Sequence, residues 1–129
     1  MVEIDTQVID VAKQYSSTAA AFKDAPLTLI HDTDGFDYMQ TTCETFDVII
    51  ADALDPIGPG ETIFTPDFYE CMYKALNNCG VACVQSECVW INLSLISDVV
   101  HYCNEIFDYA EYATANIPCF PFVDKLVLY

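Results

Sequence analysis

The sequence predicts an open α/β domain in which helices cover both faces of a mostly parallel sheet. Short runs rich in β-branched residues alternate along the chain with longer segments whose apolar residues recur at helical spacing. The chain has 129 residues, which is room for one domain with one core. Its hydrophobic fraction is 53%, yet no apolar run approaches the ~20 residues that span a bilayer. We therefore predict a single domain, residues 1–129, whose apolar side chains lie in buried strands and helices.

The first third of the chain predicts two short strands, each followed by a helix. Residues 2–4 have the composition of a strand end, and Asp5 or Thr6 can cap the helix behind it. Residues 27–30 are a short β-like run, and residues 36–42 predict a brief helix. The first helix has its apolar residues on one face, namely Val8, Val11, Ala12 and Tyr15.

The clearest strand is residues 46–51, because a β-branched run of this length is typical of a buried parallel strand. Asp52 follows at its carboxyl end and begins a loop, residues 52–60. Two prolines and two glycines give this loop a fixed path away from the sheet.

The next helix starts behind this loop. We expect Thr65 to cap it, Pro66 to occupy its first position, and Asn78 and Gly80 to close it. Its inner face is expected to hold Tyr69, Met72, Tyr73 and Leu76.

The last third continues the alternation. Residues 80–85 predict a strand, residues 92–107 an amphipathic helix and residues 109–116 another strand. A rigid loop, residues 117–121, and strand-like residues 126–129 end the chain. The amphipathic helix places on one face Ile96, Val99, Val100, Cys103 and Phe107.

Charge and cysteine content exclude several classes of protein. The chain has 20 acidic residues against 4 lysines and no arginine, a net charge of −16. Because binding to nucleic acids or anionic lipids needs a basic face, we expect neither as a partner. Seven cysteines form no Cys-x-x-Cys pair, and the acidic amino terminus has no secretory signal. We therefore predict a cytoplasmic protein with free thiols and no metal site.

Acidic residues stand just beyond the predicted strands, where open parallel sheets bind their ligands. Glu3 can accept hydrogen bonds from both hydroxyls of a ribose, and a solvated acid at a helix start is the alternative. Asp34 can meet the amino group of a purine while Gly35 lets the ring lie close to the backbone. A simple turn is the alternative for this pair.

Asp52 and Asp55 form the strongest candidate site, because proline and glycine hold these two carboxylates three positions apart at a strand end. Such a pair can hold an ammonium group with one carboxylate and accept a proton with the other. A capping role is the alternative for Asp52.

In these motifs the chain resembles the spermidine and spermine synthases, the polyamine aminopropyltransferases. The resemblance implies a partial Rossmann-like fold of the class I methyltransferase type, namely the carboxyl-terminal part of a polyamine synthase catalytic domain. The first βα unit and its glycine-rich turn are expected to be missing, which leaves unpaired edges on the strands that end at Glu3 and Asp52. The resemblance covers nearly the whole chain, through residues 2–5, 34–36, 46–50, 52, 55–59, 68–69, 80–81, 85–90 and 113–121.

The resemblance implies that putrescine or a similar diamine attacks the propyl carbon of decarboxylated S-adenosylmethionine. That molecule is a co-substrate, no prosthetic group or metal is required, and methylthioadenosine leaves. The full-length form is expected to be a homodimer. By this analogy the proton acceptor is Asp52, the far ammonium binds Asp55, the ribose binds Glu3, adenine binds Asp34 with Gly35, and Phe120 replaces the usual tyrosine beside the diamine.

Two other interpretations stay open at this point. The chain can be a noncatalytic fragment or pseudoenzyme that pairs with a complete subunit. It can also be a putrescine N-methyltransferase, in which a methyl donor faces the same amine.

Overall fold

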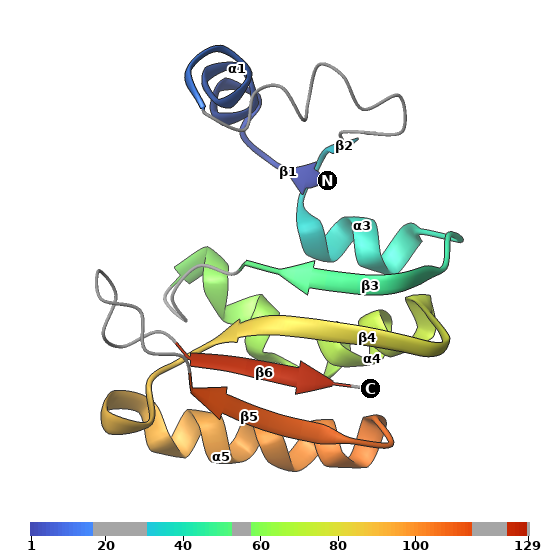
Figure 1. Cartoon of the computed structure of the whole chain (residues 1–129), viewed down its shortest axis with the longest axis vertical. Coiled ribbons are helices and arrows are strands. Elements are labelled where there is room, and N and C mark those ends of the chain that lie inside the picture. The colour runs from blue at the N-terminus through green and yellow to red at the C-terminus, as the bar shows by residue number, and fades with distance from the viewer. Residues whose placement is uncertain (17–30, 53–57, 115–123, 129) are drawn as a thin grey trace. The chain divides into compact units, whose positions relative to one another are not determined.

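The computed structural model describes residues 1–16, 31–52, 58–114 and 124–128 (Figure 1). These residues form two compact units, Met1–Thr41 and Thr42–Tyr129, and each has its own sheet. In the described part, no helix is long and apolar enough to cross a membrane.

The first unit alternates strands and helices as predicted. Its two strands pair in parallel, with Val2 opposite His31 and Glu3 opposite Asp32. A parallel pair needs a crossover connection, and a helix lies in the segment that joins the two strands. The predicted run at residues 27–30 lies outside the described residues. The elements are β1 (Val2–Glu3), α1 (Thr6–Tyr15), β2 (His31–Asp32) and α3 (Gly35–Thr41).

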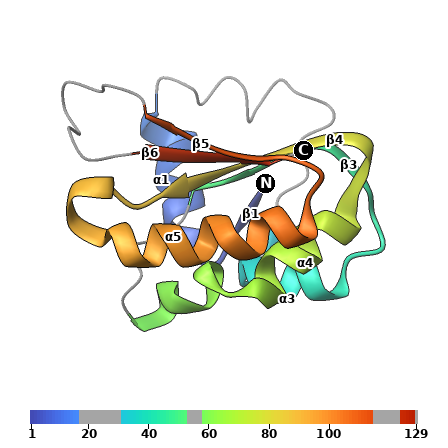
Figure 2. The same ribbon diagram turned by 90° about the horizontal axis from the view of Figure 1, so that it is seen from below.

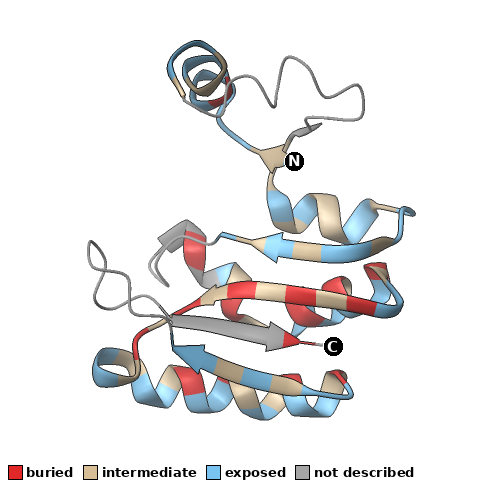
Figure 3. Ribbon diagram, in the orientation of Figure 1, coloured by how far each residue is buried: buried red, intermediate tan, exposed pale blue. Residues whose placement is uncertain are grey.

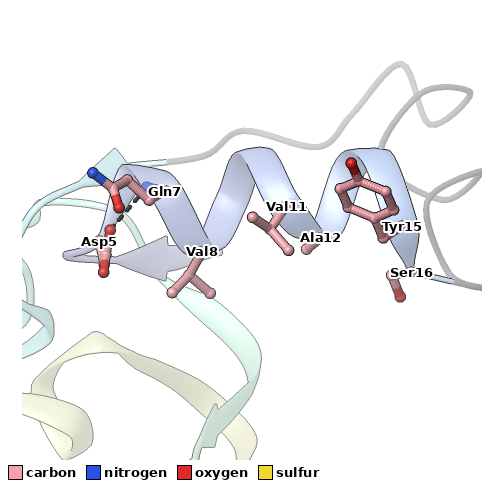
Figure 4. A pocket seen from close by; sticks show the side chains of 7 residues that line it. All are labelled: Asp5, Gln7, Val8, Val11, Ala12, Tyr15 and Ser16. Carbon is pink, nitrogen blue, oxygen red and sulfur yellow. Dashed lines mark hydrogen bonds between the residues drawn. The ribbon is translucent and has the colours of Figure 1, made fainter.

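The cap of α1 is confirmed, because the Oδ1 atom of Asp5 accepts a hydrogen bond from the backbone N–H of Gln7 at 2.8 Å. The predicted apolar residues lie along one side of this helix (Figure 4). Three of them are nevertheless exposed, with 52% of Val8, 56% of Val11 and 74% of Tyr15 accessible.

The second unit holds a four-stranded sheet in the order β3-β4-β6-β5. β3 and β4 are parallel, and β6 is antiparallel to both β4 and β5. The elements are β3 (Phe46–Ala51), η1 (Gly58–Phe64), α4 (Pro66–Ala75), β4 (Leu76–Ser86), α5 (Val89–Ile106), β5 (Ala110–Thr114) and β6 (Asp124–Leu128).

The core of this unit lies between the sheet and the helices α4 and α5, which cover the same face of the sheet (Figure 2). Alternate residues of β4, among them Ala82, Val84 and Ser86, are buried, as expected for the strand face that meets the helices (Figure 3). Their neighbours Val81 and Cys83 point to the other face and are half-buried. The other buried apolar residues of the unit are Phe64, Phe68, Tyr69, Met72, Ala75, Cys88, Ile96, Val99, Cys103, Phe107 and Leu128.

The strand prediction for residues 46–51 is confirmed, but its predicted burial is wrong. Val48 is 59% exposed and Ile50 is 76% exposed. Within the described residues β3 pairs with β4 alone, and the helices α4 and α5 cover only the opposite face. The apolar pattern of a central strand is therefore present on a strand at the edge of its sheet.

The predicted end of α4 is also wrong. The helix ends at Ala75, where the backbone N–H of the extended residue Leu76 bonds to the carbonyl groups of the last turn. The chain then enters β4 at once, so Asn78 and Gly80 belong to a strand.

The start of α4 is confirmed, but the capping hydrogen bond expected from Thr65 is not formed. Thr65 occupies the N-cap position, but its hydroxyl donates to the carbonyl of Thr62 at 2.7 Å instead of accepting from the helix. On the predicted inner face Tyr69 and Met72 are buried, whereas Tyr73 is 48% exposed.

Candidate functional site

The carboxyl ends of β3 and β4 lie at the same end of the second unit's sheet, because the strands are parallel and Ala51 lies opposite Val84. Asp52 follows Ala51 directly and its side chain is exposed. Gln85 and Glu87 follow Val84 along the neighbouring strand and its end. The predicted proton acceptor and a second acid therefore both follow the carboxyl ends of these two strands.

Glu87 is the more firmly held of these two acids. Its Oε2 atom accepts a hydrogen bond from the side-chain amide of Asn92 at 2.6 Å, and its carbonyl accepts one from the hydroxyl of Tyr112 at 2.5 Å. Asn92 has non-helical angles, φ −124° and ψ 41°, inside α5. This kink lies in the first turns of α5, close to the end of β4, and accompanies the bond to Glu87.

Glu87 was not singled out from the sequence as a site residue. A signal for it was available, because it is an acid just beyond a predicted strand, as Asp52 is. The bond to Asn92 had no such signal, because it depends on an irregularity within a helix.

In the first unit, the parallel strand pairing brings Glu3 and Asp34 to the carboxyl ends of β1 and β2. Glu3 ends β1 opposite Asp32, and Asp34 follows two residues later. The Oε1 atom of Glu3 accepts from the backbone N–H of Asp5 at 3.0 Å. The Oδ1 atom of Asp34 accepts from the N–H groups of Phe36 and Asp37 at 2.8 and 3.2 Å, so Asp34 caps α3. A carboxylate has two oxygens, so a capping role leaves room for a ligand contact.

Gly35 faces open space among the described atoms. A Cβ atom built at this position meets nothing within 4 Å, and the backbone is not in the left-handed region that favours glycine. Neither packing nor backbone geometry among the described residues therefore requires glycine here.

Asp55 and Phe120 lie outside the described residues. The predicted pairing of Asp52 with Asp55, and the place of Phe120 beside a diamine, therefore stay predictions. Glu3, Asp34 and Gly35 belong to the first unit and Asp52 to the second, and each group is described within its own unit.

A shallow groove of about 560 Å³ runs along α1 (Figure 4). Its lining is mostly apolar, and it follows the helix instead of the strand ends. It is therefore a different feature from the acidic edges. Its lining residues are Asp5, Gln7, Val8, Val11, Ala12, Tyr15 and Ser16.

The resolved pKa shifts of the described residues belong to the core. Burial raises the pKa of the Cys103 thiol to about 12. Burial, together with Cys103 and Asp98, raises the pKa of Tyr102 to about 12. Burial also raises the pKa of Tyr69. Within the described ranges, no group of three His, Cys, Asp or Glu side chains could hold a metal ion.

Comparison with known proteins identifies the family. The spermine/spermidine synthase domain matches residues 1–125. Spermidine synthase of Schizosaccharomyces pombe is 40% identical over 119 residues, which are 92% of this chain and 40% of that protein. Spermidine synthase of Coffea arabica is 38% identical over 121 residues, again 92% of this chain and 38% of that protein. The chain thus spans about two fifths of the length of these curated relatives.

Solved structures show the same fold. A spermidine synthase in complex with the transition state analogue AdoDATO superposes with a TM-score of 0.81 at 25% identity, over 98% of this chain and 44% of that chain. Human methyltransferase-like protein 13 in complex with SAH gives a TM-score of 0.79 at 22% identity, over 98% of this chain and 58% of that chain. The Rossmann-like, class I methyltransferase-like fold is therefore confirmed. The domain match and the curated relatives together show that this chain belongs to the spermine/spermidine synthase family.

Proposed function

We propose that this chain provides the carboxyl-terminal part of an aminopropyltransferase that makes spermidine. The enzyme transfers the aminopropyl group of decarboxylated S-adenosylmethionine to putrescine. The observation that supports this most is the domain match over residues 1–125, within which Asp52 follows a parallel strand at the edge where such sheets bind ligands. The solved relative that binds a transition state analogue agrees with a transfer reaction.

Asp52 acts as the proton acceptor in this proposal. An alkylamine has a pKa near that of lysine, so freeing its lone pair at pH 7 costs about 4 to 5 kcal/mol. The amine nitrogen attacks the propyl carbon, the carbon–sulfur bond breaks, and its electron pair leaves with methylthioadenosine. Asp52 takes the ammonium proton as the new carbon–nitrogen bond forms, which offsets the cost of deprotonation.

The other residues bind and orient the two substrates. Glu3 and Asp34 follow neighbouring strand ends, where they can bind a ribose and an adenine side by side. The open space at Gly35 can hold a flat ring. Asp55 holds the far ammonium and Phe120 lines the diamine pocket, both on sequence grounds alone. Glu87 adds a fixed negative charge at the strand ends that also carry Asp52, and the net charge of −16 attracts cationic substrates.

The chain spans 40% of the S. pombe relative, so the proposed activity also involves parts of such an enzyme outside the matched region. We expect it to form a homodimer and to act in the cytoplasm, where the six free cysteines of the described residues stay reduced. No prosthetic group enters the proposed chemistry.

The test is a graft in which this chain replaces the matching region of the S. pombe synthase. Release of methylthioadenosine is measured with decarboxylated S-adenosylmethionine and putrescine. We expect turnover in the graft and a fall of about 100-fold or more in kcat for Asp52→Asn. Asp67→Asn is the matched control, because Asp67 is an exposed acid in the first turn of α4, and it should keep kcat within about twofold.

Two outcomes contradict the proposal. A folded graft that releases no methylthioadenosine rejects the aminopropyl transfer. An Asp52→Asn graft that keeps about a third or more of the parent activity rejects Asp52 as the proton acceptor.

A further inference from the structure

The turn between β4 and α5 is held from two sides. The side-chain amide of Asn92 donates a part-buried hydrogen bond to Oε2 of Glu87 at 2.6 Å. The hydroxyl of Tyr112 donates a second part-buried bond to the carbonyl of Glu87 at 2.5 Å. The backbone N–H of Asn92 also bonds to the carbonyl of Cys88 at 3.0 Å. Both the carboxylate and the backbone of Glu87 are therefore fixed.

Tyr112 reaches this turn from another strand of the sheet. The registers place Val84 opposite Leu126 and Leu126 opposite Tyr112, so β6 lies between β4 and β5. β4 and β5 run in the same direction, because both are antiparallel to β6, and they end where α5 begins (Figure 1). The bond from Tyr112 therefore links β5 to the turn that starts α5.

The acid held by these bonds follows the same strand ends as Asp52. Ala51 lies opposite Val84, and Glu87 follows Val84 by three residues. In the part of the chain that the structure describes, no ion pair involves Glu87. A carboxylate that is already held in place attracts a cation without first losing side-chain entropy. The hydrogen bonds therefore make the charge of Glu87 more effective than that of a mobile surface acid.

We propose that Asn92 and Tyr112 are positioning residues for the amine substrate, and that they act through Glu87. They keep its carboxylate at the strand ends, where it favours the binding of a diamine that carries two ammonium groups. Glu87 takes no part in the proton transfer. This inference rests on the aminopropyl transfer proposed above and adds a division of roles, in which Glu87 affects KM for the diamine and Asp52 affects kcat.

The charges of the diamine explain this division. The attacking nitrogen loses its proton during the reaction, whereas the ammonium group at the far end keeps its charge throughout. Attraction to the far ammonium is therefore equal in the bound substrate and in the transition state. Such uniform binding lowers KM without raising kcat.

Glu87→Gln in the graft of this chain into the S. pombe synthase tests the charge. Glutamine keeps an acceptor oxygen for Asn92, so the substitution removes the charge and retains the bond. We expect KM for putrescine to rise about fivefold while kcat stays within about twofold. The rise should shrink when sodium chloride increases from about 0.05 M to about 0.5 M.

Glu105→Gln is the matched control. Glu105 lies near the other end of α5, and its side chain is 68% exposed. The control makes the same chemical change and removes the same charge from the chain, so it reproduces any effect of net charge alone. It should leave KM for putrescine within about twofold of the parent.

Asn92→Ala tests the positioning role, because it keeps the charge of Glu87 and removes the bond that holds it. We expect KM for putrescine to rise roughly threefold with kcat within about twofold. Asn104→Ala is its control, since it removes an amide bond to the carbonyl of Val100 at 2.7 Å on the same helix, and it should not change KM. Tyr112→Phe should resemble Asn92→Ala, and added to Glu87→Gln it should raise KM no further, because both act through one charge.

Putrescine binding to the graft, measured by calorimetry with methylthioadenosine present, gives a readout that does not need turnover. Glu87→Gln should weaken this binding by the same factor as it raises KM. A graft that binds putrescine but releases no methylthioadenosine rejects the transfer reaction, and the affinities of the Glu87→Gln and Glu105→Gln grafts then decide the present inference alone.

Four results overturn the inference. They are a parent-like affinity in Glu87→Gln, an equal loss of affinity in Glu105→Gln, a fall in kcat in place of a rise in KM, and a graft that does not bind putrescine.

Discussion

Burial in the core shifts the pKa of individual ionisable groups, and Cys103 is an example. It is fully buried, and burial raises the pKa of its thiol from 9.0 to about 12. The neighbouring Tyr102 has its pKa raised from 10.0 to about 12, and its hydroxyl donates a hydrogen bond to the carbonyl of Phe64. Both groups are therefore neutral in the folded chain over a wider pH range than in the unfolded chain.

This difference predicts a loss of stability in alkali. Between pH 9 and pH 12 the unfolded chain releases the Cys103 proton while the folded chain keeps it. The folded state then binds more protons, so the free energy of unfolding falls as the pH rises through this window. Thermal unfolding followed by circular dichroism should give a steady Tm from about pH 7 to about pH 9 and a falling Tm above it.

Variants of two cysteines test the cause. Cys103→Ala should lower the Tm at neutral pH, because it leaves a cavity, but should make the alkaline fall shallower. Cys79→Ser changes an exposed thiol and should leave the slope as in the parent. A Tm that stays constant or rises above pH 9 contradicts the prediction.

The candidate site residues were predictable where a local pattern places them. Glu3 and Asp52 were chosen as candidates because each acid directly follows or ends a recognisable strand, and the structure has strands at both places. The cap made by Asp34 was weighed as a turn, which is also a local feature. Glu87 was not chosen as a candidate, although it also follows a predicted strand. Its fixed position could not be predicted, because it depends on the kink at Asn92 and on Tyr112 from a distant strand.

Among the elements, the starts of α1 and α4 were predicted correctly, whereas β4 and α5 begin at Leu76 and Val89, before the predicted starts at residues 80 and 92. Asp5 and Pro66 mark the starts of α1 and α4 by local chemistry, and both are confirmed. The end of α4 at Ala75 was missed, because the following residues enter β4 without a turn. The exposure of β3 was missed for a different reason. The sequence of a strand indicates which of its faces is apolar, whereas the burial of that face depends on which other segments cover it.

The absence of a side chain at Gly80 allows β4 to lie close to β3. The register changes there, since Phe46 lies opposite Leu76 whereas Val48 lies opposite Val81. A Cβ atom at Gly80 would lie 2.9 Å from Cδ2 of Leu76 and 3.0 Å from the carbonyl oxygens of Asn77 and Phe46. Two of these three atoms belong to the backbone, so they cannot move away without disturbing the strand pairing.

We therefore predict that Gly80→Ala lowers the free energy of unfolding by about 1 to 3 kcal/mol. Urea denaturation gives this value directly, with the slope of the transition unchanged. Gly35→Ala is the matched control, because its added methyl group meets nothing within 4 Å, and it should cost less than about 0.5 kcal/mol. Equal effects of the two substitutions would show that the close contacts at Gly80 do not matter.

For the whole molecule, the sheet arrangement agrees with the expected unpaired edges. Within the described residues β1 pairs only with β2, and β3 pairs only with β4. These are the strands that end at Glu3 and next to Asp52, where a missing strand was expected to leave edges. The unpaired edges were predictable because the family resemblance indicated a missing strand, which hydrophobic patterning alone does not reveal.

The acidic balance has a consequence for the stability of the whole chain. The chain has twenty acidic residues and four lysines. Within the described residues the one lysine ion pair joins Lys74 to Glu70 at 3.2 Å. That pair is exposed, with 71% and 52% of the two side chains accessible, so its contribution is small. Most acidic side chains therefore repel one another without a compensating cation, and folding brings them closer together.

Salt should therefore stabilise this chain. The screening length falls from about 30 Å at 0.01 M salt to about 8 Å at 0.15 M, so added salt removes long-range repulsion before it weakens contacts. We expect the Tm to rise by about 4 °C for each ~1 kcal/mol of repulsion relieved, and to level off above about 0.3 M sodium chloride. Lys74→Gln should lower the Tm at low salt and approach the parent value at high salt, because it removes one of four cations from an exposed pair. A Tm that falls with added salt would mean that attractive pairs outweigh the repulsion, against a net charge of −16.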